Sequence, residues 1–350
     1  MHVHNRRTFL ASAGAAAVGT LVPSFGSAQN AVAPHRIDVH HHFFPAEYLK
    51  VQRAGIIAAA DADPSIFFSW TAERALGAMD ETGVAFALSS PPLPGVWITG
   101  DIPQTRKVTR IYNDGAADVA RKHPTRFGNF AALALPDVSG SLTEIEYAFG
   151  TLKVDGISLL SSYDGKWLGD PLFDPVFAEL NRRKTTVYVH PTTPACCNNI
   201  MPDVLTSNVE FLFDTTRSIV SLLYAGTFTK YPSVKFIFAH TGGTVADLSY
   251  RINAYAARHK EIADRNPDGA LAAFKKLYYD VANSTNPPAM SAILSLVPLS
   301  QILFGSDYPY VQIPVTTSGL DKLNYSAQNV AAINRDNALA LFPRLKGVTA

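Results

Sequence analysis

The sequence predicts a (β/α)8 TIM barrel with a metal site at its mouth. Short apolar, β-branched or aromatic runs alternate with helical patterns through residues 35–345. Five side chains of metal-binding type follow such runs, in the order His-x-His, His, His, Asp, at His40, His42, His190, His240 and Asp307. A side chain at the carboxyl end of a barrel strand points into the mouth, where the active sites of these barrels lie. Imidazole and carboxylate ligands suit zinc, or manganese where oxygen ligands contribute, so one divalent ion is expected.

Eight strands are predicted, and most are near-continuous apolar runs, as strands buried on both faces should be. They lie at Arg36–His42, Val84–Ser90, Phe127–Leu135, Gly156–Leu160, Thr186–His190, Lys235–His240, Leu277–Ala282 and Gln301–Asp307. Strands that alternate with helices imply βαβ units and a parallel sheet, and eight of them imply closure into a barrel.

Helical patterns lie between these strands and cover Thr71–Thr82, Pro103–Lys122, Phe173–Arg183, Asp214–Thr229, Thr244–Lys260, Pro288–Leu296 and Ala327–Leu341. Two long loops, Pro45–Trp70 and Pro91–Pro103, follow the first two strands. Their aromatic residues either wall the site for a flat ring or simply pack against the barrel. These residues are Phe43, Phe44, Phe67, Phe68, Trp70 and Trp97.

Composition excludes several classes of protein. The chain has 350 residues, of which 47% are hydrophobic and 17% charged, with a formal net charge of +1. This balance argues against global disorder, and nothing in it indicates nucleic acid or an acidic membrane surface as a partner. The only cysteines are the neighbours Cys196 and Cys197, which cannot build a disulfide framework or a CxxC zinc site.

Residues 1–28 resemble a twin-arginine export signal. Arg6 and Arg7 precede an Ala/Gly/Val-rich stretch, and small residues at 26–28 offer a cleavage site. The alternative is a chance arginine pair in an irregular N-terminus. The apolar stretch is too short and too rich in glycine for a membrane span, so we expect a periplasmic or exported protein with no span in the mature chain.

The metal prediction depends on the histidines and Asp307 taken together. Because side chains alternate along a strand, His40 and His42 share one face, with Asp38, while His41 points away. His190 and His240 each end an apolar run, and a carboxylate such as Asp307 at a strand end needs a strong partner. Each residue alone is weak evidence, but jointly they predict a metal site.

The arrangement resembles the amidohydrolase superfamily, whose barrels carry HxH on strand one, His on strands five and six, and Asp on strand eight. Binuclear members add a carboxylated Lys on strand four. Here Lys153 precedes that strand and Lys166 lies beyond it, so the resemblance implies a mononuclear site.

The likeness sharpens to the aminocarboxymuconate-semialdehyde decarboxylase family, also called amidohydrolase-2. It is carried by IDVHHHFFP, GISLLSSYDGKWLGDPLFDPVFAELNRR, VYVHP, FIFAHTGGT and LFGSDYP, and covers most of residues 35–345. It implies zinc or manganese held by His40, His42, His190 and Asp307, with acid–base work by His240 or Asp307. The γ-resorcylate type has Glu in place of His40, so a γ-resorcylate substrate is less expected.

Two further residues are implied by the same resemblance. Arg251, eleven residues after His240, matches an Arg that reaches the neighbouring subunit and binds substrate carboxylate, which implies a homodimer; the alternative is a surface Arg. Asp214 resembles an acidic residue of that family whose carboxylate could accept a hydrogen bond from a histidine ring and so orient it. Its alternative role is the N-cap of a helix that begins at Thr215.

The predicted activity is metal-dependent, non-oxidative decarboxylation of a small aromatic or unsaturated carboxylic acid, such as a hydroxybenzoate, a 6-methylsalicylate-like acid or an aminocarboxymuconate-like acid. The same ligands could instead activate water against a lactone, an amide or a conjugated diacid, as a hydrolase or hydratase. A third hypothesis, from another class, is an exported metal-binding or solute-binding barrel without turnover.

Overall fold

The computed structural model describes residues 35–60, 63–197, 200–201 and 203–347. Contacts divide the chain into Met1–Ala31 and Val32–Ala350. The predicted export signal lies outside the described residues, and the account below concerns the second unit. None of the helices among the described residues is long and apolar enough to cross a membrane.

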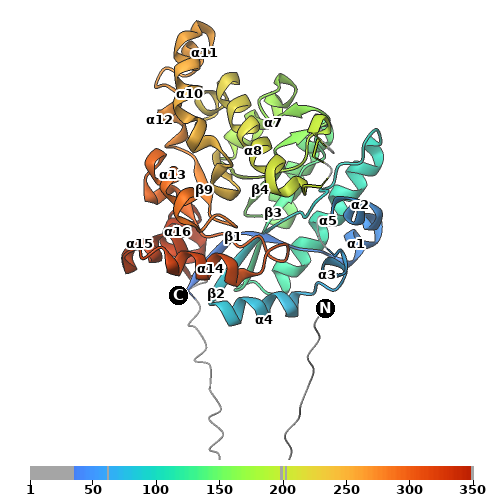
Figure 1. Ribbon diagram of the computed structural model, residues 1–350. Coiled ribbons are helices and arrows are strands. Elements are labelled where there is room, and N and C mark those ends of the chain that lie inside the picture. Colours follow the sequence, from blue (N-terminus) through green and yellow to red (C-terminus); the bar gives the residue numbers. More distant parts are fainter. Residues whose placement is uncertain (1–34, 61–62, 198–199, 202, 348–350) are drawn as a thin grey trace, which may run out of the picture. The chain divides into compact units, whose positions relative to one another are not determined.

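Eight parallel strands form one sheet in the order β1-β2-β3-β4-β7-β8-β9-β10, as the sequence predicted. They are β1 (Arg36–His42), β2 (Val84–Ser90), β3 (Phe127–Ala132), β4 (Gly156–Leu160), β7 (Thr186–His190), β8 (Lys235–Phe238), β9 (Tyr278–Asp280) and β10 (Ile302–Leu303). A short hairpin of β5 (Ser162–Tyr163) and β6 (Lys166–Trp167) follows β4. Helices lie around the strands (Figure 1), so the predicted TIM barrel is confirmed.

The barrel closes between β1 and the segment after β10. Three backbone hydrogen bonds close it. The Val39 N–H donates to the Phe304 carbonyl at 3.0 Å, the Asp307 N–H to the His40 carbonyl at 2.8 Å, and the His42 N–H to the Tyr308 carbonyl at 2.8 Å. The last predicted strand, Gln301–Asp307, is therefore shorter than expected, because its final residues leave the regular ladder. Asp307 itself has a φ of 67°, which a strand does not allow.

The helices match the sequence patterns in most places. They are α1 (Ala46–Val51), α2 (Arg53–Ala59), α3 (Ser65–Phe68), α4 (Ala72–Thr82), α5 (Ile102–Lys122), α6 (Val138–Tyr147), α7 (Asp174–Arg182), α8 (Thr206–Ala225), α9 (Thr227–Lys230), α10 (Val245–Arg258), α11 (Lys260–Arg265), α12 (Ala270–Phe274), α13 (Pro287–Leu296), α14 (Ile313–Lys322), α15 (Ala327–Ala331) and α16 (Asn337–Leu341). The sequence interpretation missed α6, α11, α12 and α14, and it took the segment containing α1–α3 for a loop.

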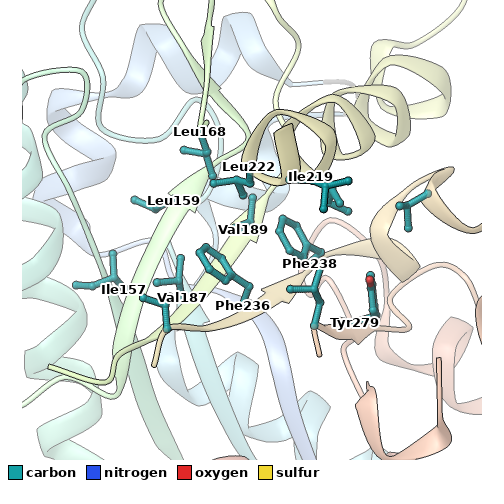
Figure 2. Packing of buried hydrophobic residues seen from close by; sticks show 14 of the residues in the cluster. Ile157, Leu159, Leu168, Val187, Val189, Ile219, Leu222, Phe236, Phe238 and Tyr279 are labelled. Carbon is teal, nitrogen blue, oxygen red and sulfur yellow. The ribbon is translucent and has the colours of Figure 1, made fainter. Parts of the chain in front are cut away.

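The outward faces of the strands pack on the helices. Alternate residues of β4, β7 and β8 lie in one buried hydrophobic cluster with Ile219 and Leu222 of α8 (Figure 2). The strand residues are Ile157, Leu159, Val187, Val189, Phe236 and Phe238. Because strand side chains alternate, Tyr188 and His190 belong to the opposite face of β7 from Val187 and Val189. The same packing that buries the valines therefore aims His190 into the barrel.

Of the two alternatives for the loop aromatic residues, packing against the barrel is the one that the buried ones follow. Phe43, Phe44 and Phe67 are fully buried in one hydrophobic cluster. The rings of Phe44 and Phe67 stack with their centroids 5.1 Å apart, and Phe43 packs on Trp70. The packing alternative is correct, since burying these rings away from water is more favourable than leaving them on a loop surface.

Candidate active site

Three imidazoles and one carboxylate meet at the mouth of the barrel. His40, His42, His190 and Asp307 are buried, and each places one possible ligand atom within 4.8 Å of the others. Asp307 Oδ1 lies 3.1 Å from His40 Nε2 and 3.1 Å from His42 Nε2. These are the four residues that the resemblance implied as metal ligands, and the chain brings them together from β1, β7 and the turn after β10.

The imidazoles of His40, His42 and His190 each form a hydrogen bond through Nδ1. A hydrogen bond at this atom fixes the ring and leaves the Nε2 lone pair for a metal. The partners are Asp280 Oδ2 for His40 at 3.0 Å, Ser90 Oγ for His42 at 3.3 Å and the Pro191 carbonyl for His190 at 2.8 Å.

The donor set fits a divalent ion. His40 Nε2 is buried and makes no well-directed hydrogen bond among the described residues, although Asp307 Oδ1 lies 3.1 Å away, and buried polar atoms are rarely left so. Burial alone would lower the pKa of His40, but Asp280 and Asp307 outweigh it and raise the pKa to about 10. The two carboxylates thus favour positive charge at this point, which a metal ion would supply. Imidazole and carboxylate ligands suit zinc and manganese.

His240 lies beside the four-residue group and is not part of it. Its Nδ1 donates to the Ala282 carbonyl at 2.9 Å, and its Nε2 is 4.0 Å from Asp307 Oδ2. The predicted strand Lys235–His240 ends at Phe238 instead, and His240 follows it in a turn with a φ of 53°. This position leaves Nε2 free to exchange a proton with a molecule held next to Asp307.

Four non-glycine residues around this mouth have left-handed backbone conformations. His240, Thr241, Asn283 and Asp307 have φ values of 53°, 56°, 50° and 67°. Such conformations are uncommon outside glycine and cluster at functional sites, where surrounding structure holds them in place. Here they turn side chains from three successive strand ends into one cavity.

Asp280, at the end of β9, is a functional residue that the sequence interpretation missed. Its Oδ2 accepts from His40 Nδ1 and, at 3.2 Å, from the Tyr188 hydroxyl. Its Oδ1 accepts from the backbone N–H groups of His240 at 3.1 Å and Ala282 at 3.0 Å. A carboxylate at the end of a short aromatic run, in LYYD, was the available signal. Asp280 links a candidate metal ligand to the turn that carries His240.

Replacing Asp280 by Asn should weaken the metal site while leaving the fold intact. The amide keeps the shape of the side chain but cannot accept on both atoms. Loss of such a partner typically costs about 10- to 100-fold in metal affinity or activity. Metal dissociation constants would be measured for Asp280→Asn and for a control, Asp268→Asn, whose carboxylate is exposed beside Lys276. Equal constants for both variants would show that Asp280 does not orient His40.

Asp38 does not share the face of His40 and His42, which corrects the simple alternation expected for β1. Its carboxylate accepts from His41 Nδ1 at 3.1 Å and from the Ser306 hydroxyl at 2.5 Å. The pairing of β1 with β2 shifts register between Asp38 and His41, and a bulge of this kind re-aims side chains. Asp38 thereby joins β1 to the residue before Asp307 and helps to place that carboxylate.

Asp214 lies within α8 and not at its start, so its N-cap alternative is wrong. It accepts hydrogen bonds from the hydroxyls of Ser161 and Ser162 and, at 2.6 Å, from the Trp167 indole. Among the described residues it makes no hydrogen bond to a histidine. Asp214 is linked to His190 only through Ser161, whose hydroxyl donates to Asp214 and whose backbone N–H donates to the His190 carbonyl at 2.8 Å.

Arg251 is exposed on α10. Its predicted reach into a neighbouring subunit stays a prediction.

A cavity of about 360 Å³ opens onto Asp307, His190 and His240, within the range of small-molecule sites. The first turns of α8 line it with Phe211 and Leu212. Its other lining residues are Ala59, Leu93, Leu205, Ser207, Asn208, Asn283, Ser284, Tyr310 and Val311. Polar and apolar residues line it in equal number, which suits a small ring that carries polar substituents.

Relatives of this chain include several decarboxylases. A 6-methylsalicylic acid decarboxylase of Penicillium expansum is 31% identical over 322 residues, covering 89% of this chain and 98% of the relative. Decarboxylase yanB of Aspergillus niger is 33% identical over 332 residues, covering 89% of this chain and 88% of the relative.

Solved structures share the fold. A 2,6-dihydroxybenzoate decarboxylase complexed with 2,6-dihydroxybenzoate has a TM-score of 0.78 at 21% identity, covering 88% of this chain and 99% of that one. A 5-carboxyvanillate decarboxylase from Novosphingobium aromaticivorans, complexed with manganese and a nitrobenzoic acid, has a TM-score of 0.77 at 23% identity, covering 88% and 96%. The family model described as Amidohydrolase matches residues 37–344. The chain therefore belongs to this amidohydrolase family, as its motifs predicted.

Proposed function

We propose that the protein is a metal-dependent, non-oxidative decarboxylase of a 2-hydroxybenzoic acid of the 6-methylsalicylate type. The observation that carries the proposal is the convergence of three imidazoles and Asp307 at the end of a ring-sized cavity, with His240 beside them. The relatives with the highest identity given above act as decarboxylases, and one is named for 6-methylsalicylic acid.

We infer that the cofactor is one zinc or manganese ion held by His40, His42, His190 and Asp307. When bound, the ion would supply Lewis-acid charge stabilisation and a template for the carboxylate and its neighbouring hydroxyl. A solved relative of the same fold carries manganese, and the three imidazoles and one carboxylate within ligand distance of one another support a site for one ion.

The chain's own residues would handle the proton. Decarboxylation needs protonation of the ring carbon that bears the carboxylate, and the electrons of the broken C–C bond then restore the aromatic ring. His240 Nε2 and Asp307 Oδ2, 4.0 Å apart, are the two groups that face the reacting end of the cavity. Either can deliver the proton, and Phe211 and Leu212 would hold the ring while limiting access of water.

The test is an assay of the purified, metal-loaded protein with a panel of acids. The panel contains 6-methylsalicylate, salicylate and 2,6-dihydroxybenzoate, together with aryl lactones and amides and a conjugated diacid. Release of carbon dioxide and the matching phenol from 2-hydroxybenzoates supports the proposal. Hydrolysis of lactones or amides, or hydration of the diacid, without release of carbon dioxide would replace it with a hydrolase or hydratase. Tight binding without turnover would indicate a binding protein.

We further propose a homodimer in which Arg251 completes the neighbouring active site. Arg251 is exposed on the helix that follows the His240 turn, and a guanidinium binds a carboxylate with two parallel hydrogen bonds. Mixing Arg251→Ala chains with His190→Ala chains should then restore activity, because a mixed dimer contains one intact composite site. Each parent should be nearly inactive alone. A fully active monomer at the assay concentration would remove this role from Arg251.

Residues 1–28 are proposed to direct export through the twin-arginine pathway. Arg6 and Arg7 carry the signal, so replacing both by Lys should leave the protein in the cytoplasm of a bacterial host, while the unchanged chain reaches the periplasm. Cell fractionation would measure the distribution. Equal distribution of the two forms would favour the alternative of a chance arginine pair.

A further inference from the structure

The two cysteines lie side by side in the loop between β7 and α8, shortly after His190. Their sulfur atoms are 2.8 Å apart, Cys196 is exposed and Cys197 is buried. That separation is about 0.8 Å longer than the roughly 2.05 Å of a disulfide bond. The two sulfur atoms are therefore close enough to react with each other once the backbone of the turn adjusts.

The pair is chemically asymmetric. The hydrogen bond with Cys196, together with burial, raises the pKa of the Cys197 thiol to about 11. Cys197 thus stays protonated at neutral pH, and Cys196 is the sulfur that an incoming molecule can reach. A reagent therefore reacts first with the exposed Cys196, and the buried Cys197 is the neighbouring thiol that can react next.

We propose that Cys196 and Cys197 form a modification site for low-molecular-weight disulfides, which close a reversible bond between the two neighbours. The Cys196 thiolate attacks one sulfur of the reagent, forms a mixed disulfide and releases one thiol. Cys197 then loses its proton and attacks the Cys196 sulfur, which releases the second thiol. Two electrons pass from the protein to the reagent, and the two thiol protons end on the two released thiols.

The resulting bond would be labile. Neighbouring Cα atoms are about 3.8 Å apart across a trans peptide, less than the roughly 4.4–6.8 Å of ordinary disulfides. A strained bond has a more oxidising potential and is reduced easily. The site therefore suits reversible modification better than permanent cross-linking.

The modification would act on the substrate cavity through Leu205. A small cavity of about 40 Å³ is lined by Cys197 and Leu205, among others, and Leu205 also lines the cavity at the candidate metal site. Bond closure reshapes the turn at Cys196–Cys197, and the wall beside Leu205 has to adjust. Small misplacements of positioning groups lower rates strongly, so the oxidised form should turn over substrate more slowly.

The experiment treats the full, metal-loaded protein with glutathione disulfide and follows three quantities. Intact mass should fall by two hydrogen atoms. kcat/KM for carbon dioxide release should fall about 3- to 10-fold, with metal content unchanged. Hydrogen exchange in the first turns of α8 should change. A phosphine reductant should reverse all three effects.

Matched variants separate ring closure from simple thiol capping. Cys196→Ser should show no effect of glutathione disulfide, and Cys197→Ser should keep a mixed disulfide at most. A wild-type protein that stays reduced, or that stops at the mixed disulfide, would overturn the proposal, as would ring closure without any change in turnover or exchange. If no acid is decarboxylated even by reduced protein, the proposed function fails, while mass and exchange still decide this site.

Discussion

His190→Ala is expected to lose both the metal ion and the activity. His190 contributes one of three imidazoles that lie with Asp307 within ligand distance of one another, and removing a ligand from a four-residue set leaves too few donors to retain a divalent ion. Wild-type protein should hold about one ion per chain and the variant close to none. Elemental analysis and carbon dioxide release would be measured on the same preparations.

Asp307→Ala should behave in the same way, for an additional electrostatic reason. Burial raises the pKa of a carboxyl, yet the adjacent imidazoles, His40 above all, hold the pKa of Asp307 well below its ordinary value. It therefore stays ionised and available as a ligand before substrate binds, and it could donate a proton only after taking one up from the substrate. His259→Ala is a suitable control, because His259 is exposed at the end of α10. A fully active preparation without metal would end the metal-dependent interpretation.

His240→Ala should lower the rate and keep the metal. Its Nε2 is 4.0 Å from Asp307 Oδ2 and its Nδ1 is held by the Ala282 carbonyl, so it is placed for proton transfer beside the ligand group. Loss of general acid–base catalysis costs roughly 10²–10⁴-fold in rate. Steady-state kcat and metal content would be determined together.

Two outcomes would change the assignment of His240. Loss of metal to the extent seen with His190→Ala would place His240 among the ligands. A rate close to that of wild type would leave Asp307 as the sole candidate proton donor. Asp280 ties the His240 turn to His40, so the metal analysis of Asp280→Asn provides the necessary comparison for indirect effects.

The sequence by itself was sufficient for the barrel and for the candidate ligands. Strands buried on both faces must be apolar along their length, so all eight stand out, and the polar residue that ends such a run is conspicuous. His190 after TVYV is an example. Because the carboxyl ends of parallel strands meet at one end of a barrel, residues far apart in sequence could be expected at one site.

Local chain features were harder to predict. The sequence pattern starts the helix before strand six at Asp214, but α8 begins at Thr206, and its added turns line the cavity with Phe211 and Leu212. The bulge in β1 turns Asp38 away from His40 and towards Ser306. Strand periodicity alone cannot show a register shift, which depends on the partner strand.

Only the tertiary structure decided how the site is supported. Asp280 became recognisable when β9 was seen beside β8 and His40 across the barrel, since a hydrogen bond between residues 240 positions apart leaves no local pattern. Closure of the barrel also depends on bonds from β1 to residues 304–308, where the sequence predicts a longer strand. The sequence determined which side chains reach the mouth through periodicity and burial. Their orientation came from long-range hydrogen bonds, which form only after the strands have come together.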